Sequence, residues 1–462
     1  MELNGKRVLV VGLGRSGVAS ALFLQSRGAR VTVSDAKSED QLRDQIPTLL
    51  DAGIAVETGA HGERTFRNQD LIVVSPGVPV DAEPLVQARA LGQPVIGEIE
   101  LASQFLPGPI IAITGSNGKT TTTTLVGEIL SASGLNALVG GNIGTAAISL
   151  AGEATPQTAI VLEVSSFQLE TIGTFRPKVA VVLNVTPDHL DRHGTFAAYV
   201  DAKARIFENQ QADDFAVLNA DDPTCVDLAK RSRAQVFWFS REREVESGAF
   251  VHDDQVVFRR NESAQSIVAA AEIPLKGSHN LENVLAAVCA GALMGCSPEK
   301  IRGAIVDFKA VEHRLEYVAT IGGVEFYNDS KATNVDATMK ALQSFPSNIH
   351  LILGGKDKGS DYTLLNDLLR ERVKSVYTIG AAAEKIQSHI KGTTQIVSSG
   401  TIESAVKQAS ATAQPGDIVL LAPACASFDQ FRSYEHRGRV FKDLVGQLAA
   451  SNPSSGAREP RE

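Results

Sequence analysis

The sequence contains few cysteines, and none of them is in a metal-binding arrangement. Cys225, Cys289, Cys296 and Cys425 are scattered through 462 residues with no C-x-x-C spacing. This scatter argues against a zinc site and against a disulfide framework, and it fits a reducing compartment. We therefore expect the four side chains to be core residues.

The sequence also lacks an excess of positive charge and lacks long apolar runs. Lysine and arginine total 44 against 53 acidic residues, a net charge of −9, so no general attraction to nucleic acid or to an anionic membrane is expected. No apolar run approaches the roughly 18 residues of a membrane span, and no basic, apolar leader opens the chain. The sequence predicts a cytoplasmic protein that binds neither nucleic acid nor membrane. An anionic ligand would need a local basic pocket.

The order of apolar segments predicts an α/β protein. Short β-branched runs alternate with amphipathic segments of helical length along nearly the whole chain, a pattern typical of parallel sheets wrapped by helices. The length allows about three domains of roughly 100–200 residues. We place one boundary after the strand PVIGE and another beyond an acidic, turn-rich region at 241–280, which gives domains 1–97, 98–309 and 310–462. The tail from Ser451 is expected to be disordered.

A glycine loop near the N-terminus is typical of a nucleotide-binding turn. Gly12, Gly14 and Gly17 form G-x-G-x-x-G between the strand VLVV and a helix, and Asp35 closes the next strand. Such glycines allow a tight turn, and the helix N-terminus presents N–H groups to a diphosphate. A carboxylate placed like Asp35 can accept a hydrogen bond from a ribose hydroxyl. The alternative is a tight strand-to-helix turn without a ligand.

A second glycine loop, TGSNGKTT at 114–121, is the stronger signal. It lies between the strand IIAI and a threonine-rich helix. Backbone N–H groups of such a loop wrap phosphate oxygens, Lys119 adds positive charge, and the Thr120 hydroxyl can bind Mg²⁺. The general P-loop spacing would need glycine where this chain has Ile113, so only the compressed pattern T-G-x-x-G-K-T is met.

Polar groups follow further predicted strands. Glu163 ends a strand expected beside the phosphate loop, where its carboxylate would complete a Mg²⁺ shell. Asp188 and His189 lie in the loop TPDHLDRH, which is either functional or simply solvated. Lys203 lies on an amphipathic helix, and the charge pattern alone predicts a surface lysine.

The C-terminal third contains polar clusters at predicted strand ends. Asn280 and Asn283 open a helix, where they either cap it or bind a base. The segments VEHRLE, YNDSKATN and LGGKDKG suggest a site for an anion, with solvated loops as the alternative.

Taken together, the motifs resemble those of one enzyme family. GSNGKTT, GGNIG, EVSSFQLE, NVTPDHLDRH, GSHNLEN, EHRLE, NDSKATN, LGGKDKG and APACASFDQF occur in the order found in the Mur ligases of peptidoglycan synthesis. The resemblance extends from residue 1 to about residue 450. It implies a Rossmann-like N-terminal domain, a central parallel-sheet domain of P-loop type that binds a mononucleotide, and a Rossmann-like C-terminal α/β domain. The segments GLGRSG, EVSSFQLE and PACASFDQF are most similar to members that add D-glutamate to UDP-N-acetylmuramoyl-L-alanine, using ATP and an acyl-phosphate intermediate.

The resemblance also implies roles for single residues. The UDP-linked substrate would lie near Gly14, Arg15, Ser16, Asp35, Asn142 and Ser165. ATP would contact Gly115, Ser116, Asn117, Gly118, Lys119, Thr120, Thr121, Asn280, Asn283, Arg314 and Asp329. Two Mg²⁺ ions would be held by Thr120, Glu163, His189 and a carbamylated Lys203.

By the same resemblance, the catalytic residues would be Lys119, His189 and Lys203. The D-glutamate site would comprise Thr333, Lys356, Ser427 and Tyr434. The small-molecule substrates would be the only partners, and we expect a monomer.

Three other functions fit part of the sequence. A folylpolyglutamate synthase-like ligase shares the phosphate loop but lacks this N-terminal domain. A nicotinamide-dependent dehydrogenase would explain G-x-G-x-x-G but leaves Lys119 and Thr120 without a role. A non-enzymatic nucleotide switch is disfavoured by the anion-binding groups of the third domain. Binding assays with UDP, ATP and NAD would separate these functions.

Overall fold

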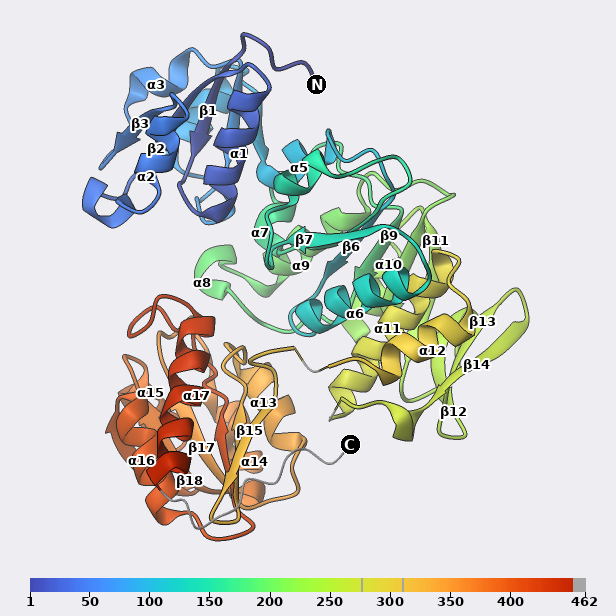
Figure 1. Cartoon of the computed structure of the whole chain (residues 1–462), viewed down its shortest axis with the longest axis vertical. Coiled ribbons are helices and arrows are strands. Elements are labelled where there is room, and N and C mark those ends of the chain that lie inside the picture. The colour runs from blue at the N-terminus through green and yellow to red at the C-terminus, as the bar shows by residue number, and fades with distance from the viewer. Residues whose placement is uncertain (276, 310, 452–462) are drawn as a thin grey trace. The chain divides into compact units, whose positions relative to one another are not determined.

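The computed structural model of the chain describes residues 1–275, 277–309 and 311–451. They divide into two compact units, each built of helices and strands (Figure 1). The first unit comprises residues 1–185, 197–272 and 282–306, and the second comprises 186–196, 273–281 and the chain from 307 onward. The α/β class is confirmed, and three sheets are present in the described residues. The boundaries expected after residues 97 and 309 stay predictions.

The first sheet of the first unit is fully parallel and has the order β3-β2-β1-β4-β5. Its strands are β1 (Arg7–Val11), β2 (Arg30–Asp35), β3 (Ala55–Thr58), β4 (Leu71–Val74) and β5 (Val95–Gly97). Its helices are α1 (Arg15–Ser26), η1 (Glu39–Leu42), α2 (Ile46–Asp51), α3 (Glu63–Arg67) and α4 (Glu83–Ala90). The strand order reverses between β1 and β4, and the loops after these two strands meet at the carboxyl edge, where Ser75 Oγ donates to the Gly12 carbonyl at 2.7 Å.

The second sheet of the first unit has nine strands in the order β14-β13-β12-β11-β10-β9-β6-β8-β7. The strands are β6 (Ile110–Thr114), β7 (Ala137–Gly141), β8 (Ala159–Glu163), β9 (Val179–Val182), β10 (Phe215–Asn219), β11 (Gln235–Ser240), β12 (Gly248–His252), β13 (Gln255–Arg260) and β14 (Ser263–Ala269). β6 and its neighbours β8 and β9 are buried on both faces, which explains their continuous apolar sequences. The loops after these central strands carry the groups described below.

The helices around this sheet are mostly short. They are α5 (Glu98–Ser103), α6 (Lys119–Ala132), η2 (Ala147–Gly152), α7 (Ser166–Leu169), α9 (Phe196–Ala204), η3 (Arg205–Phe207), α10 (Pro223–Ala229), η4 (Ala270–Glu272), α11 (Ser278–Leu293) and α12 (Pro298–Val306). α6 and α12 pack together (Figure 1).

The region expected to be merely acidic and rich in turns forms the antiparallel strands β12 to β14. Its two hairpin turns are the polar dipeptides Asp253-Asp254 and Asn261-Glu262, whose four residues all have positive φ values. Two consecutive residues with positive φ match the twist of a tight hairpin. The prediction counted the charges in this region and missed the apolar residues between them.

The sheet of the second unit has the order β15-β16-β20-β17-β18-β19, parallel except for the β15–β16 pair. Its strands are β15 (Glu316–Ile321), β16 (Val324–Asn328), β17 (Ile349–Gly354), β18 (Val373–Ile379), β19 (Gln395–Gly400) and β20 (Ile418–Leu421). Its helices are α8 (Leu190–His193), α13 (Val335–Gln343), η5 (Tyr362–Leu365), α14 (Asn366–Arg372), α15 (Ala383–His389), α16 (Ile402–Thr412) and α17 (Tyr434–Ser451). Ser451 ends α17, so its assignment to a disordered tail is wrong. The rest of that tail, 452–462, lies outside the described residues.

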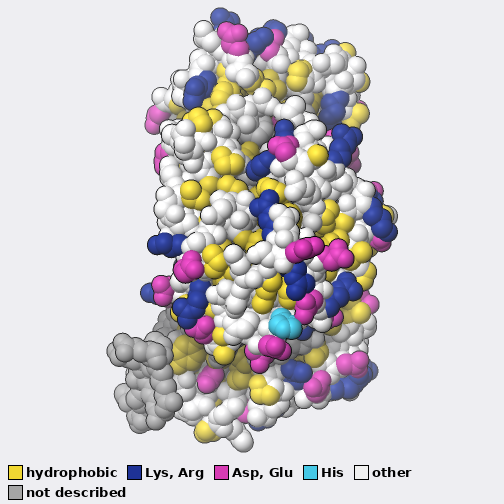
Figure 2. All heavy atoms as spheres, turned by 90° about the vertical axis from the view of Figure 1, so that its right-hand side faces the viewer, with side chains coloured by type: hydrophobic (Ala, Val, Ile, Leu, Met, Phe, Trp, Pro, Cys, Tyr) yellow, Lys and Arg dark blue, Asp and Glu magenta, His cyan; other side chains and the backbone are white. Residues whose placement is uncertain are grey.

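The expectation for the cysteines is confirmed. All four are free and buried. No helix in the described part of the chain is both long enough and apolar enough to span a bilayer. Acidic and basic side chains are interspersed on the face drawn in Figure 2.

Glu98, the first residue of α5, is a buried acid and leads to a stability prediction. Its side chain is almost fully buried, one carboxylate oxygen accepts a hydrogen bond from the Ile148 N–H at 2.8 Å, and burial raises its pKa to about 7. The folded state therefore holds this proton more tightly than the unfolded state, and the free energy of unfolding falls as pH rises from about 4.5 to 7. Glu98→Gln has no carboxyl group to titrate and does not lose stability in this way. We therefore expect the free energy of unfolding of the variant, minus that of the parent chain, to be on the order of 1–3 kcal/mol higher at pH 8 than at pH 4.5.

Thermal unfolding of both proteins at the two pH values measures this difference. The exposed Glu153 provides the control, because Glu153→Gln should give the same small difference at both pH values. A Glu98→Gln effect that did not change with pH would contradict the prediction.

Candidate active site

The compressed phosphate loop connects β6 to α6 at the carboxyl edge of the nine-stranded sheet. Gly118 has φ +86°, and a Cβ atom there would lie 2.1 Å from the Asn283 Oδ1 atom on α11. Only glycine meets both requirements, because it tolerates positive φ and has no side chain. The loop leads directly into the first turn of α6, whose backbone N–H groups suit a phosphate.

Two lysine side chains converge on one carbonyl of this loop. Lys119 Nζ donates to the Gly115 and Ser116 carbonyl oxygens, both at 2.8 Å, and Lys203 Nζ donates to the same Gly115 oxygen at 2.8 Å. Lys203 is only 1% exposed, and its Nζ lies 4.5 Å from the centroid of the Tyr199 ring. Two ammonium groups on one buried oxygen concentrate positive charge where an anion would bind.

The expectation of a surface lysine at position 203 is therefore wrong. The tertiary partner of Lys203 is a backbone carbonyl 88 residues earlier in the chain, and the charge pattern of α9 contains no sign of it. The Tyr199 hydroxyl, one turn earlier on the same helix, lies 3.1 Å from Ser116 Oγ. Two side chains of α9 thus contact the phosphate loop.

Oxygen-bearing side chains meet beside the loop. β6 and β8 are parallel neighbours, as expected, and the Thr120 hydroxyl donates to Glu163 Oε2 at 2.8 Å. Asn142 Nδ2 donates to the other carboxylate oxygen of Glu163 at 2.8 Å. Glu163 and Thr120 are both buried. A carboxylate and a hydroxyl in contact are the donors that Mg²⁺ prefers, so these residues fit that ion.

Asn184 holds the loop from the neighbouring strand end, and the sequence analysis did not name it. Its side chain accepts from the Asn117 N–H at 2.9 Å and donates to the Asn117 carbonyl at 3.2 Å. Its carbonyl accepts from the Ser116 N–H at 2.9 Å. The signal was its place in the segment VVLNV, two residues after the end of the buried strand β9.

The N-terminal glycine loop is ordered by the carboxylate that was predicted to bind ribose. Asp35 accepts from the Leu13 N–H at 2.6 Å and from the Lys37 N–H at 2.9 Å. Each carboxylate oxygen keeps a further lone pair, so a ribose contact stays a prediction. Arg15 donates to the Gly144 carbonyl of the GGNIG loop at 2.6 Å. Gly14 and Arg15 are exposed and Ser16 is half-buried.

Ser165, predicted on the side of the muramoyl peptide, caps helix α7. Its hydroxyl accepts from the Gln168 N–H at 3.3 Å, and the Gln168 side chain bonds back to the Ser165 backbone N–H at 2.9 Å. This is a capping box. The hydroxyl therefore has a structural role whatever the substrate does.

The predicted metal ligands come from both units. Thr120, Glu163 and Lys203 belong to the first unit, whereas His189 belongs to the second. Within the second unit, the neighbouring Asp188 accepts from Lys358 Nζ at 2.7 Å and from Asn334 Nδ2 at 3.0 Å, and it lies 3.6 Å from His189 Nε2. Burial alone would raise the pKa of Asp188, but the charges of Lys358 and His189 outweigh it and hold the pKa well below its ordinary value. The TPDHLDRH loop is thus built into a charged network.

The residues predicted for D-glutamate lie in loops at the carboxyl ends of three adjacent strands, β16, β20 and β17, or at the start of α17. Lys356 exchanges two backbone hydrogen bonds with Ala426, at 2.8 and 3.1 Å, which places it beside Ser427. Lys331 Nζ lies 3.9 Å from the centroid of the Tyr434 ring. Lys331 was not assigned a role, although it lies in the same motif as Thr333.

Two residues predicted to contact the nucleotide interact within the second unit. Asp329 is buried, and burial raises its pKa to about 6 against the opposing charge of Arg314. It also accepts from the Leu315 N–H at 3.3 Å. Asn280, on the first turn of α11, is buried as well.

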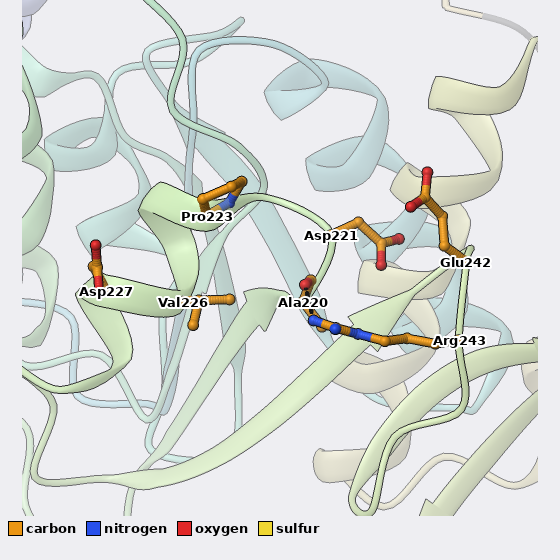
Figure 3. Close-up of a pocket in the computed structure, with 7 residues that line it drawn as sticks. All are labelled: Ala220, Asp221, Pro223, Val226, Asp227, Glu242 and Arg243. Atoms are coloured by element: carbon orange, nitrogen blue, oxygen red, sulfur yellow. Dashed lines mark hydrogen bonds between the residues drawn. The ribbon is translucent and has the colours of Figure 1, made fainter.

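A hollow of about 620 Å³ lies elsewhere in the first unit, beside the ends of β10 and β11 (Figure 3). Its lining includes Asp221, Asp227, Glu242 and Arg243. Asp221 already accepts from Ser240 Oγ at 2.6 Å and from the Arg241 N–H at 2.7 Å, so its carboxylate orders the turn. None of the predicted site residues lines this hollow.

Family models match most of the chain. They are the Mur ligase MurD-like N-terminal domain at residues 6–97, the Mur ligase middle domain at 113–291 and the Mur ligase glutamate ligase domain at 313–425. The UDP-N-acetylmuramoylalanine--D-glutamate ligase of Koribacter versatilis is 66% identical over 97% of this chain and 99% of its own length. The protein of the same name from Acidobacterium capsulatum is 60% identical over 98% of this chain and 100% of its own length.

Solved structures share the fold at low sequence identity. The UDP-N-acetylmuramate-alanine ligase MurC of Thermotoga maritima aligns with a TM-score of 0.59 at 20% identity, over 96% of this chain and all of its own. The MurF ligase of Thermotoga maritima in complex with ADP aligns with a TM-score of 0.60 at 18% identity, over 90% of this chain and 95% of its own. With three family models in order and relatives of high identity over nearly the full length, the chain belongs to the Mur ligase family.

Proposed function

We propose that this protein joins D-glutamate to UDP-N-acetylmuramoyl-L-alanine and converts one ATP to ADP and phosphate for each amide formed. The observation that carries the proposal is the phosphate loop, with two lysine ammonium groups on the Gly115 carbonyl and the Thr120–Glu163 contact beside it. Two curated relatives that are 60% or more identical are named for this reaction. A nicotinamide dehydrogenase would leave this loop without a role.

The reaction needs an activated carboxylate, because oxide is a poor leaving group. The γ-phosphoryl group passes from ATP to the alanyl carboxylate, the bond to ADP breaks, and an acyl phosphate forms. The neutral amine of D-glutamate then attacks the acyl carbon, phosphate leaves with the former carboxylate oxygen, and the nitrogen loses one proton to solvent and keeps the other as the amide N–H. ATP, the alanyl carboxylate and D-glutamate are the only reactants that these steps need.

The residues of this chain would bind and neutralise the phosphates. Lys119 would stabilise negative charge as the β–γ bridge breaks, and the N-terminus of α6 would hold the phosphate oxygens. Thr120 and Glu163 would hold Mg²⁺, which when bound supplies further neutralisation of the phosphates. The Asn117–Asn184 pair keeps the loop in its binding shape.

We further propose that Lys203 is carbamylated by CO₂ in the active enzyme. The ammonium group loses one proton, the neutral amine attacks CO₂, and a second proton is released to solvent. The resulting carbamate replaces a positive charge with a negative one and supplies oxygen donors for a second Mg²⁺. Support comes from the burial of Lys203 and from its sharing one carbonyl with Lys119, because a carbamate would turn two like charges into an attractive pair. His189 would be a further ligand of that ion.

The same proposal extends to location and assembly. We propose that the protein acts in the cytoplasm, as a monomer, on small-molecule substrates alone. The four free and buried cysteines support a reducing compartment. The net charge of −9 supports a protein that does not bind nucleic acid.

The acyl phosphate can be tested with isotope-labelled substrate. When the alanyl carboxylate carries ¹⁸O, we expect one labelled oxygen in each released phosphate, because that oxygen leaves with the phosphorus. Mass spectrometry of the phosphate measures it, with D-glutamate compared against L-glutamate, L-lysine and meso-diaminopimelate. Label-free phosphate would rule out the acyl phosphate, and release that depends on another amino acid would rule out D-glutamate.

A further inference from the structure

Arg437 is the largest fully buried side chain in the described part of the chain. It lies in the first turn of α17, and its relative exposure is 0%. Nε donates to Ser330 Oγ at 3.0 Å, and Nη2 donates to the Ser330 carbonyl at 2.8 Å. Both terminal nitrogens also donate to the Cys425 carbonyl at 3.2 Å. The guanidinium group therefore ties two loops to one helix.

These loops are the ones that carry the predicted amino-acid site. Ser330 follows β16 and lies three residues before Thr333, and Cys425 follows β20 and lies two residues before Ser427. A third loop follows β17, where a Cβ atom on Gly355, the residue before Lys356, would lie 3.2 Å from Arg437 Nη1. One side chain thus lies directly behind all three loops.

The charge of Arg437 is balanced only in part, by the carboxylate of Asp429, which acts on it without a hydrogen bond in the described structure. Its hydrogen-bond acceptors in the described structure are two carbonyls and one hydroxyl, and none is a carboxylate. Burial lowers the pKa of Arg437 to about 10, so the group stays charged at neutral pH. A buried charge normally has a counter-ion, because its desolvation is unfavourable. An anionic substrate on the other side of the loops would reduce that unfavourable free energy.

We propose that Arg437 is the positioning residue of the amino-acid subsite. It holds the loops of Thr333, Lys356 and Ser427 in register and gives them a fixed positive potential that favours an amino acid with two carboxylates. It acts from behind the loops and does not touch the substrate. This inference rests on the proposed addition of D-glutamate.

The test compares the KM values of the full-length enzyme for its three substrates. Arg437→Met removes both the charge and the hydrogen bonds. We expect the KM for D-glutamate to rise about 10- to 100-fold, the range found when residues that orient metal ligands through hydrogen bonds are replaced. The KM values for ATP and for the UDP-linked substrate should stay within about twofold. Arg437→Lys keeps the charge without the planar fork, so its KM for D-glutamate should be intermediate.

Arg372 provides a matched control in the same unit. It donates to the Gln343 and Phe345 carbonyls, at 3.2 and 2.8 Å, and holds none of the three loops. Arg372→Met should reduce thermal stability without a selective change in the KM for D-glutamate. If Arg437→Met fails to fold, Arg437→Lys decides the question by the same comparison of KM values.

The outcomes are distinguishable. A selective rise in the KM for D-glutamate supports the proposal. A second variant, Arg437→Ala, should show the same rise, and guanidinium chloride, at concentrations well below those that denature the protein, should partly lower this KM again. Equal shifts for all three substrates, or a loss of stability alone, would overturn the proposal and leave Arg437 a purely structural residue. If the parent protein, without any substitution, releases no phosphate with D-glutamate, the proposed function is wrong, and this inference is wrong with it.

Discussion

Lys119→Ala is expected to fold normally and to lose about 100-fold or more in turnover. The side chain is half-buried, and its ammonium group contacts two carbonyls of the phosphate loop at 2.8 Å. In the reaction it would stabilise charge on the leaving diphosphate, and a single preorganised donor of this kind is worth about 3–4 kcal/mol. Phosphate release at saturating substrates measures the loss.

Lys178 provides the control for this variant. It lies in the same unit, and its ammonium group pairs with the exposed Asp213 at 3.1 Å and with the buried Asp214 at 3.4 Å. Lys178→Ala should keep turnover within about twofold, because Lys178 lies at the amino ends of β6 and β9, whereas the phosphate loop follows the carboxyl end of β6. If Lys119→Ala retained turnover within a few-fold of the parent chain, the chemical step would have to be placed away from this loop.

Lys203→Ala is expected to reduce activity at least as strongly, and a small carboxylate should partly restore it. If the active form carries a carbamate, the variant loses both metal-binding oxygens and leaves space behind the loop. Acetate fits this space and supplies the same donor atoms. The measurement is phosphate release with increasing acetate, at constant ionic strength maintained with chloride.

The two lysine variants serve as controls for one another. Acetate should restore Lys203→Ala but not Lys119→Ala, because an anion cannot replace the lost ammonium group. Full activity of Lys203→Ala without acetate would end the carbamate proposal. The ligase assignment would survive this result.

Much of the fold follows from local sequence patterns. The strands VLVV and IIAI are continuous apolar runs because their sheets are covered on both faces, and each was predicted where it occurs. The glycine loops follow from strict backbone requirements, of which Gly118 is the clearest. The pairing of Thr120 with Glu163 follows from the parallel neighbours β6 and β8.

What the sequence did not predict is the burial of two charged side chains whose partners are mostly backbone atoms distant along the chain. Lys203 and Arg437 are charged residues on amphipathic helices, a pattern that predicts exposed side chains. In the structure, Lys203 donates to a carbonyl 88 residues away, and Arg437 donates to carbonyls 12 and 107 residues away. A carbonyl carries no side-chain signal, so hydrophobic periodicity cannot locate it. The hairpins of β12 to β14 were missed because their acidic residues, Asp253, Asp254 and Glu262, lie at the turns rather than along the strands.

The reactivity of the four buried cysteines can report local opening of the structure around each of them. Burial raises the pKa of all four thiols, so a thiol reagent reacts only when the surrounding structure opens. Cys225, Cys289 and Cys296 belong to the first unit and Cys425 to the second. Labelling followed by peptide mapping thus reads the opening of each unit separately, with no engineered probe. Cys425 reads the loop that Arg437 holds, so the same chemistry distinguishes a loosened subsite from global unfolding.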